Sequence, residues 1–430
     1  MLTRLQRWGY GFARFGSTIF MGLYDFASFY IYWQVFQLRP VDAGLIGVAG
    51  KMTIILASIV VGYLSDSIWT RWGKRKPFIA TGAPALALSG FLHFTPIYFL
   101  PAGEYTLILL WGVATSALFH FFYAWLLTPY QAWLAEISEP AERVDISMVQ
   151  NLANIFGNVV STVTGFLAKM LVAMGFFMPL IGAYSLVLIA LFTPPVILIP
   201  VERRTEVRLN VLKDFKEVVK YREYVKWLGV RGFMSAAQHM LVVTVIAYIE
   251  KVIGVEHSLA AASFGLVLVL FVAGAFPLWG RVAKQRGKGY ALSRAILLLI
   301  LVFMLVPLPH FVSGALRIAL GYLIVAVGAI AVSAYVLFPY AVVADLAHWY
   351  ETQRGESRAG LFTGLEGIPI NIFESIAYAV TGFLMSLPEV PDGGYTAGLL
   401  LWGFVAAAFA TCALAILKRT NIDPFLKRES

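Results

Sequence analysis

The feature that most constrains this chain is a series of long, almost uninterrupted apolar segments. A bilayer core of about 30 Å needs roughly 20 helical residues to cross it, and a scan for such segments finds about twelve. Because the apolar runs are continuous and do not alternate with a period of two, they predict helices rather than barrel strands. The expected spans lie near residues 10–38, 43–65, 78–99, 105–136, 146–173, 177–199, 225–251, 260–282, 290–309, 314–345, 358–386 and 395–417.

Composition indicates the same class of protein. Of the 430 residues, 60% are hydrophobic and 13% charged, whereas soluble domains average roughly 45–50% apolar and 25% charged residues. We therefore predict an all-α membrane protein with twelve transmembrane helices. The single cysteine, Cys412, excludes an intramolecular disulfide. The first apolar segment is long and contains Arg14 and Asp25, unlike the short apolar core of a cleavable signal peptide.

The basic excess of the chain, a formal charge of +9, follows the expected topology. Lysines and arginines concentrate in the even-numbered gaps between spans and at the termini. By the positive-inside rule, both termini and all basic loops are cytoplasmic, and we expect the plasma membrane as the location. Because membrane topology accounts for the basic residues, no nucleic-acid partner is expected. The basic loops are also expected to attract anionic lipid. The basic stretches are Arg71 to Lys76, Arg203 to Lys226, Arg281 to Lys288, Arg354 with Arg358, and the tail from Lys418.

The longest polar segment, Val201 to Lys226, divides the spans into six plus six. We predict an N-terminal six-helix bundle over residues 1–200 and a C-terminal bundle over residues 225–430. The linker between them, residues 201–224, is expected to hold a short amphipathic helix on the inner membrane surface.

The two halves repeat one another in sequence. The RWGK sequence at Arg71 to Lys74 recurs as QRGK at Gln285 to Lys288. The end of the fourth span, from Pro129 to Glu136, likewise recurs in the tenth, from Pro339 to Asp345. An offset of roughly 210 residues in both cases predicts a parallel duplication of a six-helix unit.

The loops after the second span of each half are candidate latches of a rocking transporter. Glycine and the basic cluster allow a tight cytoplasmic turn and place Asp66 near a helix end, where it can bond to a neighbouring helix. We predict that a cytoplasmic gate is formed by Asp66, Arg71, Gly73, Lys74, Glu136 and Asp345.

Several of these stretches resemble a known family. The sequences GYLSDSIWTRWGKRKPF from Gly62, TPYQAWLAEISEPAER from Thr128, YAVVADLAHWYETQRGESRAGLFTGL from Tyr340 and YGFARFG from Tyr10 are similar to signature regions of the glycoside-pentoside-hexuronide cation symporters. This family is a branch of the major facilitator superfamily. The resemblance implies a fold of two six-helix bundles, secondary active transport and a sugar or glycoside as the solute.

The same resemblance also implies departures from the family's charged sites. The two aspartates of the family's sodium site fall on Ile54 and Ser58, neither of which supplies a carboxylate. We therefore expect a sodium site of that kind to be missing. The family's sugar-binding positions fall on Thr18, Leu127, Gln131, Gln150 and Asn371.

Polar residues inside the spans are the other candidates, because each costs roughly 2.5–3.5 kcal/mol on insertion scales when ionisable. Arg14, Thr18 and Asp25 are spaced to share one helical face. Asp25 is either the proton carrier or a substrate ligand, or it makes a structural bond to another helix. Asn151 and Asn154 begin a row of carboxamides suited to a hydroxylated ligand or to helix association.

Later spans and aromatic residues add further candidates. Glu374 is a second candidate for ion coupling, whereas Glu366 is expected to pair with a loop arginine. His120 is either a proton relay or a packing residue. Trp33 is a candidate for stacking on a sugar ring.

No catalytic constellation, metal-spaced cluster or phosphate loop occurs, so we expect no enzyme activity, no metal and no cofactor. We predict proton-coupled symport of a sugar or glycoside by alternating access, with a central site near the bilayer midplane and a monomeric protein. The alternatives are a carrier of lysolipids or other amphipathic solutes, a sugar uniporter, and a membrane receptor or scaffold.

Overall fold

A computed structural model describes residues 2–101, 103–138, 140–200, 220–255, 258–354, 362, 365–391 and 393–425. These ranges are helical, with two isolated bridges, Thr70 with Gly73 and Glu389 with Thr396, as their extended pairings. Within them, eleven helices are long and apolar enough to cross a membrane. The all-α prediction is confirmed. The chain forms two compact units, Met1–Glu206 and Val207–Ser430.

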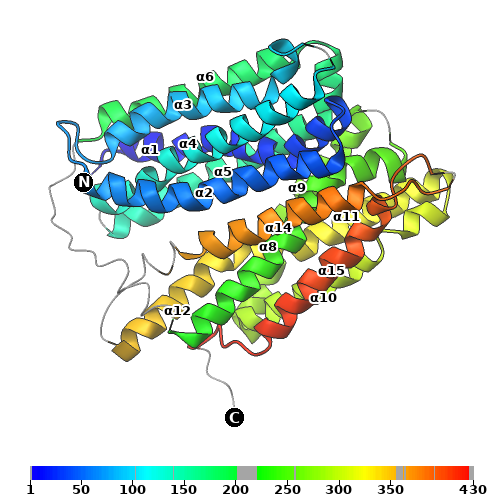
Figure 1. Cartoon of the computed structure of the whole chain (residues 1–430). Helices are drawn as coiled ribbons and strands as arrows, with labels where there is room; N and C mark the ends of the chain where they lie inside the picture. The colour runs from blue at the N-terminus through cyan, green and yellow to red at the C-terminus, as the bar shows by residue number, and fades with distance from the viewer. Residues whose placement is uncertain are drawn as a thin grey trace. The chain divides into compact units, whose positions relative to one another are not determined.

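The first unit holds six long helices that run alongside one another (Figure 1). In this unit α1 packs against α5 and α6, α3 packs against α4 and α6, and α2 packs against α4. Small residues allow the close approach of α1 and α5, since a Cβ on Gly157 would lie 2.8 Å from Thr18 Cβ. The helices are α1 (Arg4–Leu23), α2 (Pro40–Ser67), α3 (Lys76–Phe94), α4 (Tyr105–Ile137), α5 (Pro140–Ala173) and α6 (Phe177–Leu198).

The first expected span differs from the others in its backbone. Thr3 caps α1 through a capping box with Gln6. After Leu23 the helix continues into two π-helical segments, η1 (Tyr24–Ser28) and η2 (Ile31–Val35). This span is not among the eleven apolar helices, because Arg14 and Asp25 make it more polar. π-helical turns are rare and occur frequently at functional sites.

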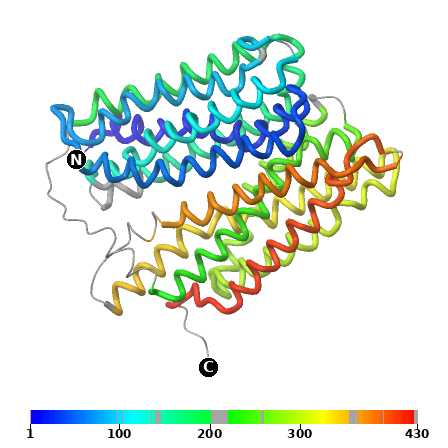
Figure 2. The backbone as a smooth tube through the Cα atoms, in the orientation of Figure 1, coloured from blue at the N-terminus to red at the C-terminus, as the bar shows by residue number. Residues whose placement is uncertain are grey.

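Among the described residues, the second unit is built from nine helical segments, which Figure 2 traces in green to red. In this unit α8 packs against α14 and α15, α10 packs against α11 and α15, and α9 packs against α11. The segments are α8 (Arg222–Tyr248), η4 (Ile249–Ile253), α9 (Ser258–Arg286), α10 (Lys288–Met304), η5 (Leu308–Phe311), α11 (Gly314–Leu337), α12 (Pro339–Arg354), α14 (Gly367–Met385) and α15 (Gly398–Leu417).

Some boundaries differ from the sequence expectation. The expected span 314–345 consists of two helices, because Pro339 has no N–H to continue the ladder of α11 and instead begins α12. The expected span 358–386 begins, among the described residues, with α14 at Gly367. The amphipathic helix expected in the linker falls on residues 201–219, which lie outside the described residues.

The sequence repeat is accompanied by repeated local geometry. The first helix of each unit ends in a π-helical segment, η2 after α1 and η4 after α8. The glycines of the RWGK and QRGK sequences, Gly73 and Gly287, both have a φ of 88°. Each glycine precedes the third long helix of its unit, although eight residues separate α2 from α3 and Gly287 alone separates α9 from α10.

Candidate functional site

A lysine and an aspartate form an ion pair among the helices of the first unit. Lys51 Nζ, on α2, lies 2.9 Å from Asp25 Oδ1, in the first turn of η1. The Lys51 side chain is 4% exposed and that of Asp25 is 27% exposed. Ionisable groups at such positions in a spanning helix are functional candidates by default, because the cost of placing them there is high.

The surroundings of this pair are closely packed. A Cβ on Gly50, next to Lys51, would lie 2.4 Å from His120 Nδ1, so the glycine is needed for α2 and α4 to approach. His120 is fully buried, and its Nδ1 donates to Ser116 O at 2.9 Å. The Tyr24 hydroxyl, beside Asp25, lies 2.6 Å from Ser116 Oγ. These contacts hold His120 in a fixed position, and both of its predicted roles, packing residue and proton relay, stay predictions.

A second polar group joins α1 to α5. Arg14 Nε donates to Asn154 Oδ1 at 3.1 Å, and Thr18 Oγ1 lies 2.6 Å from the same oxygen. Arg14, Thr18 and Asp25, predicted to share one helical face, thus have different partners. Arg14 and Thr18 contact Asn154, whereas Asp25 contacts Lys51. Asn154 of the carboxamide row thus bonds to α1, whereas Asn151 is exposed.

The other predicted binding residues of the first unit are placed separately. Gln150 Nε2 donates to the Tyr130 hydroxyl at 3.2 Å. The Tyr130 and Tyr10 rings stack with centroids 4.4 Å apart, and each hydroxyl donates to the other residue's carbonyl. Gln131 is exposed. Trp33 is half-buried, with its ring 5.8 Å from that of Phe29.

Three of the five predicted gate residues of the first unit gather around an arginine that was not among the candidates. Arg75 Nη2 donates to Glu136 Oε1 at 2.7 Å and also bonds to Asp66, while Nη1 donates to Ser65 Oγ at 2.7 Å. Lys74 Nζ lies 2.9 Å from the same Glu136 oxygen. We call Asp66, Lys74, Arg75 and Glu136 the Arg75 cluster.

Charge pairing dominates the Arg75 cluster. Burial of Arg75 opposes its charge, but the hydrogen bonds and attraction from Glu136 and Asp66 outweigh burial and raise the pKa of the guanidinium above its ordinary value. The predicted gate residue Arg71 lies outside the cluster, with its guanidinium 5.8 Å from the ring of Trp72. Gly73 forms the turn by exchanging backbone hydrogen bonds with Thr70.

The second unit contains the equivalent ion pair. Lys288, which ends the QRGK sequence, bonds to Asp345 on α12. Asp423, after α15, accepts from the backbone N–H groups of Lys288 at 3.0 Å and Gly289 at 2.7 Å. Its carboxylate also lies 3.7 Å from Lys288 Nζ. The pairs of Lys74 with Glu136 and Lys288 with Asp345 therefore join the same two repeated sequence elements in each unit.

Glu366 has a partner on a neighbouring helix of the second unit. Its carboxylate lies 3.2 Å from Nε of Arg231, on α8. The expected pairing with a loop arginine stays a prediction, because Arg358 lies outside the described residues. Glu366 also accepts from Trp227 Nε1 at 2.8 Å. Glu366 is 6% exposed, so its charge needs this local compensation. The Arg231 guanidinium in turn lies 4.7 Å from the centre of the Tyr335 ring.

The remaining candidates of the second unit lie on α14. Asn371 Nδ2 donates to Gly367 O of its own helix at 2.7 Å. Glu374 is half-buried. The carboxylates of Glu374 and Glu366 both attract the Arg231 guanidinium electrostatically. Within the described ranges, no three His, Cys, Asp or Glu side chains gather as a metal site.

Sequence reasoning missed Lys51, Arg75 and Arg231 as partners of its candidate carboxylates. A signal existed for Lys51, because it is the only charged residue in the apolar run from residue 43 to residue 65. Arg75 was one of several cations in a basic loop, and sequence gives no means to choose among them.

The fold and these intramembrane ion pairs define a membrane transporter of the major facilitator type. The chain belongs to the MFS/sugar transport protein family, whose profile matches residues 9–420. This finding confirms the membership that the sequence motifs predicted. The protein is accordingly a multi-pass membrane transporter of a small solute rather than an enzyme.

Two curated relatives align over most of the chain. The isoprimeverose transporter of Lactiplantibacillus pentosus is 23% identical, covering 91% of this chain and 81% of its own. The uncharacterized symporter YnaJ of Bacillus subtilis (strain 168) is also 23% identical, covering 98% and 89%. Among solved structures, a bacterial homolog of the human lysosomal transporter Spinster, in an inward-facing conformation, matches with a TM-score of 0.70. It is 14% identical and 97% of each chain is covered, so it supports the fold alone.

Proposed function

We propose that the protein is a proton-coupled symporter of a sugar or glycoside that works by alternating access. The observation that carries this proposal is the ion pair between Lys51 Nζ and Asp25 Oδ1, at 2.9 Å inside the first unit. A carboxylate that is partly open to water and paired with a buried lysine can exchange a proton at the cost of breaking the pair. Protonation of Asp25 then changes which partners both side chains prefer, as a coupling site requires.

The placement of Lys51 also favours protons over sodium. Ile54 and Ser58, the positions of the related symporters' sodium-site aspartates, follow Lys51 by three and seven residues and therefore share its helical face. Ile54 is 8% exposed and packs with Ala57 and Ala124. On this face the ammonium of Lys51 repels a sodium ion, and the side chain of Ile54 offers it no oxygen ligand. A proton needs only the Asp25 carboxylate as its acceptor.

The substrate class rests on the polar, mostly uncharged residues of the same unit and on the relatives. Thr18, Asn154 and Gln150 supply hydroxyl and carboxamide groups, which suit a hydroxylated ligand. One curated relative is named as an isoprimeverose transporter and the family as sugar transport proteins. Asn371, Trp33, Gln131 and Asn151 remain candidate ligands. Glu374 remains the second coupling candidate, and a monomer in the plasma membrane with cytoplasmic termini remains our expectation.

The test is uptake by proteoliposomes from a mixed pool of sugars and glycosides, read by mass spectrometry. Uptake is compared with and without an inward proton gradient, and with and without sodium. Accumulation that requires only the proton gradient supports the proposal. Accumulation that requires sodium contradicts it, and uptake that only equilibrates indicates a uniporter.

The Asp25→Asn variant tests the coupling site itself. It should lose proton-driven accumulation but keep exchange of solute across the membrane, because exchange needs no net proton movement. A matched control is Asp42→Asn, which removes an aspartate of α2 that pairs with Arg39. Unchanged accumulation in Asp25→Asn would exclude Asp25 as the carrier. If no sugar is taken up at all, lysolipids and other amphipathic solutes become the candidates.

A further inference from the structure

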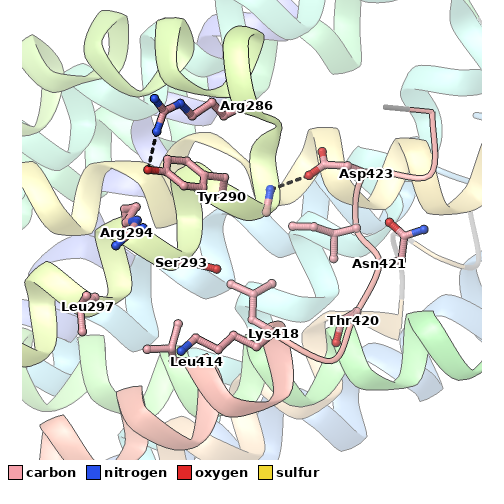
Figure 3. Close-up of a pocket in the computed structure, with 13 residues that line it drawn as sticks. Arg286, Tyr290, Ser293, Arg294, Leu297, Leu414, Lys418, Thr420, Asn421 and Asp423 are labelled. Carbon is pink, nitrogen blue, oxygen red and sulfur yellow. Dashed lines mark hydrogen bonds between the residues drawn. The ribbon is translucent and has the colours of Figure 1, made fainter. Parts of the chain in front are cut away.

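A pocket with a volume of about 420 Å³ lies in the second unit, where the end of α9, the start of α10 and the end of α15 meet (Figure 3). Its lining includes three cationic side chains, Arg286, Arg294 and Lys418. None of the functions described above uses this pocket. It lies at the ends of helices that span the membrane, and hence at the level where lipid headgroups meet water.

Two of the three cations of the pocket lie beside one aromatic ring. Arg286 Nη1 donates to the Tyr290 hydroxyl at 2.8 Å. The guanidinium carbons of Arg286 and Arg294 lie 5.1 and 5.0 Å from the centre of the same Tyr290 ring. Stacking on Tyr290 restrains both arginines without neutralising them. In the described part of the chain, no carboxylate forms an ion pair with Arg286, Arg294 or Lys418.

The acidic residue of the pocket wall, Asp423, already has hydrogen-bond and charge partners. Asp423 accepts from the N–H groups of Lys288 and Gly289 and lies near the Lys288 ammonium, as described above. Its negative charge is therefore already compensated by groups at the start of α10. The pocket keeps a positive potential that suits an anion.

The wall also has an apolar side. Leu297 follows Arg294 by about one turn of α10 and is 41% exposed, and Leu414 and Leu417 line the pocket from α15. A ligand that fills the site meets cations at the helix ends and leucine side chains further along the helices. A free inorganic anion uses the first feature only, whereas an amphiphile uses both.

We propose that this pocket binds the phosphate of an anionic phospholipid headgroup. Arg286, Arg294 and Lys418 contact the phosphate oxygens, and the start of an acyl chain lies along Leu297. Guanidinium groups suit this task, because their donors match phosphate oxygens in pairs. Basic pockets between spanning helices are recognised sites for such headgroups. The proposal does not depend on the identity of the transported solute.

The experiment is a titration of the purified full-length protein in detergent with phosphatidylglycerol or phosphatidylcholine, followed by native mass spectrometry. The wild type should bind phosphatidylglycerol about tenfold more tightly than phosphatidylcholine, and the Arg286→Gln/Arg294→Gln variant should lose that preference. The matched control, Arg281→Gln/Lys284→Gln, removes two exposed cations of α9 outside the pocket and should keep it. Equal losses in the two double variants, or no headgroup preference in the wild type, would overturn the proposal.

Two further measurements separate the lipid from a soluble anion. Inorganic phosphate at millimolar concentration should not displace the lipid, because it cannot use the leucine wall. Displacement by phosphate would assign the site to a soluble ligand and overturn the lipid proposal. Leu297→Gln keeps all three cations and should weaken phosphatidylglycerol binding severalfold, and an unchanged affinity would contradict the proposed path of the acyl chain. Because both changed arginines are exposed, Arg286→Lys/Arg294→Lys provides a folded variant with partial affinity.

Discussion

Gly73 and Gly287 have the same positive φ of 88°, each as the glycine of the RWGK or QRGK sequence. An L-residue other than glycine is strained at this φ. Lys74 and Lys288 come directly after these glycines and reach Glu136 and Asp345. The repeated glycine thus sets the direction from which the repeated lysine approaches its carboxylate.

The turn glycines should not tolerate alanine. We expect Gly73→Ala and Gly287→Ala each to lower stability by about 1–2 kcal/mol, because alanine pays the left-handed backbone cost. The measurement is thermal unfolding of the purified variants in one detergent. Gly280→Ala is the control, since Gly280 lies within α9 with nothing within 4 Å of an added Cβ. It should be neutral or stabilising by up to about 1 kcal/mol, and equal losses at all three sites would contradict the assignment.

The pair of Lys51 and Asp25 predicts non-additive stability effects. Lys51→Met leaves the Asp25 carboxylate without this cation and should cost about 1–3 kcal/mol, since Asp25 keeps some access to water. The double variant Asp25→Asn/Lys51→Met should recover much of that loss, because neither charge remains. A double-mutant cycle of unfolding free energies measures the coupling between them. Strict additivity would show that the pair contributes nothing as a pair.

The two carboxylates of the eleventh expected span should separate in function. Glu366→Gln leaves Arg231 without its close anion and should cost about 3 kcal/mol of stability. Glu374→Gln should change stability less and, if Glu374 is the second coupling site, should reduce proton-driven accumulation. Thermal unfolding and uptake are measured on the same preparations. A stable Glu366→Gln protein with lost accumulation would reverse the two roles.

Glu136 should be the most sensitive acid of the Arg75 cluster. Glu136→Gln removes the anion that serves both Lys74 and Arg75, whose side chains are 8% and 5% exposed, and should cost about 2–4 kcal/mol. Asp66→Asn is the control within the same cluster. Its side chain is 42% exposed, so the expected loss is below about 1 kcal/mol. Chemical unfolding of both variants under matched conditions compares them, and similar losses would count against the burial argument.

The positions of the spans were predictable because apolar length is a local property of the sequence. The helix α6, expected at 177–199 and found at Phe177–Leu198, shows how well hydropathy alone performs. Pro339 was a sequence signal for the division of the expected span 314–345 into α11 and α12. A proline inside a span does not by itself fix a helix boundary, because it can also kink a continuous helix.

The partners of the charged candidates were not predictable in the same way. Glu366 and Arg231 lie 135 residues apart in the chain, and the packing of α14 against α8 brings their side chains together. The spacing of Arg14, Thr18 and Asp25 assumes a uniform α-helix, whereas Asp25 lies in the π-helical segment η1. Sequence identifies which residues are costly in a membrane, and tertiary packing decides which residues compensate them.

The π-helical segments after α1 contain more residues per turn than an α-helix does. A π-turn holds one residue more than an α-turn, so its conversion to α-helix would turn all that follows by about 100° relative to all that precedes it. Asp25 lies inside the first of these turns and Trp33 inside the second. A change of winding at η1 would therefore separate Asp25 from Lys51 and rotate Trp33 relative to Arg14.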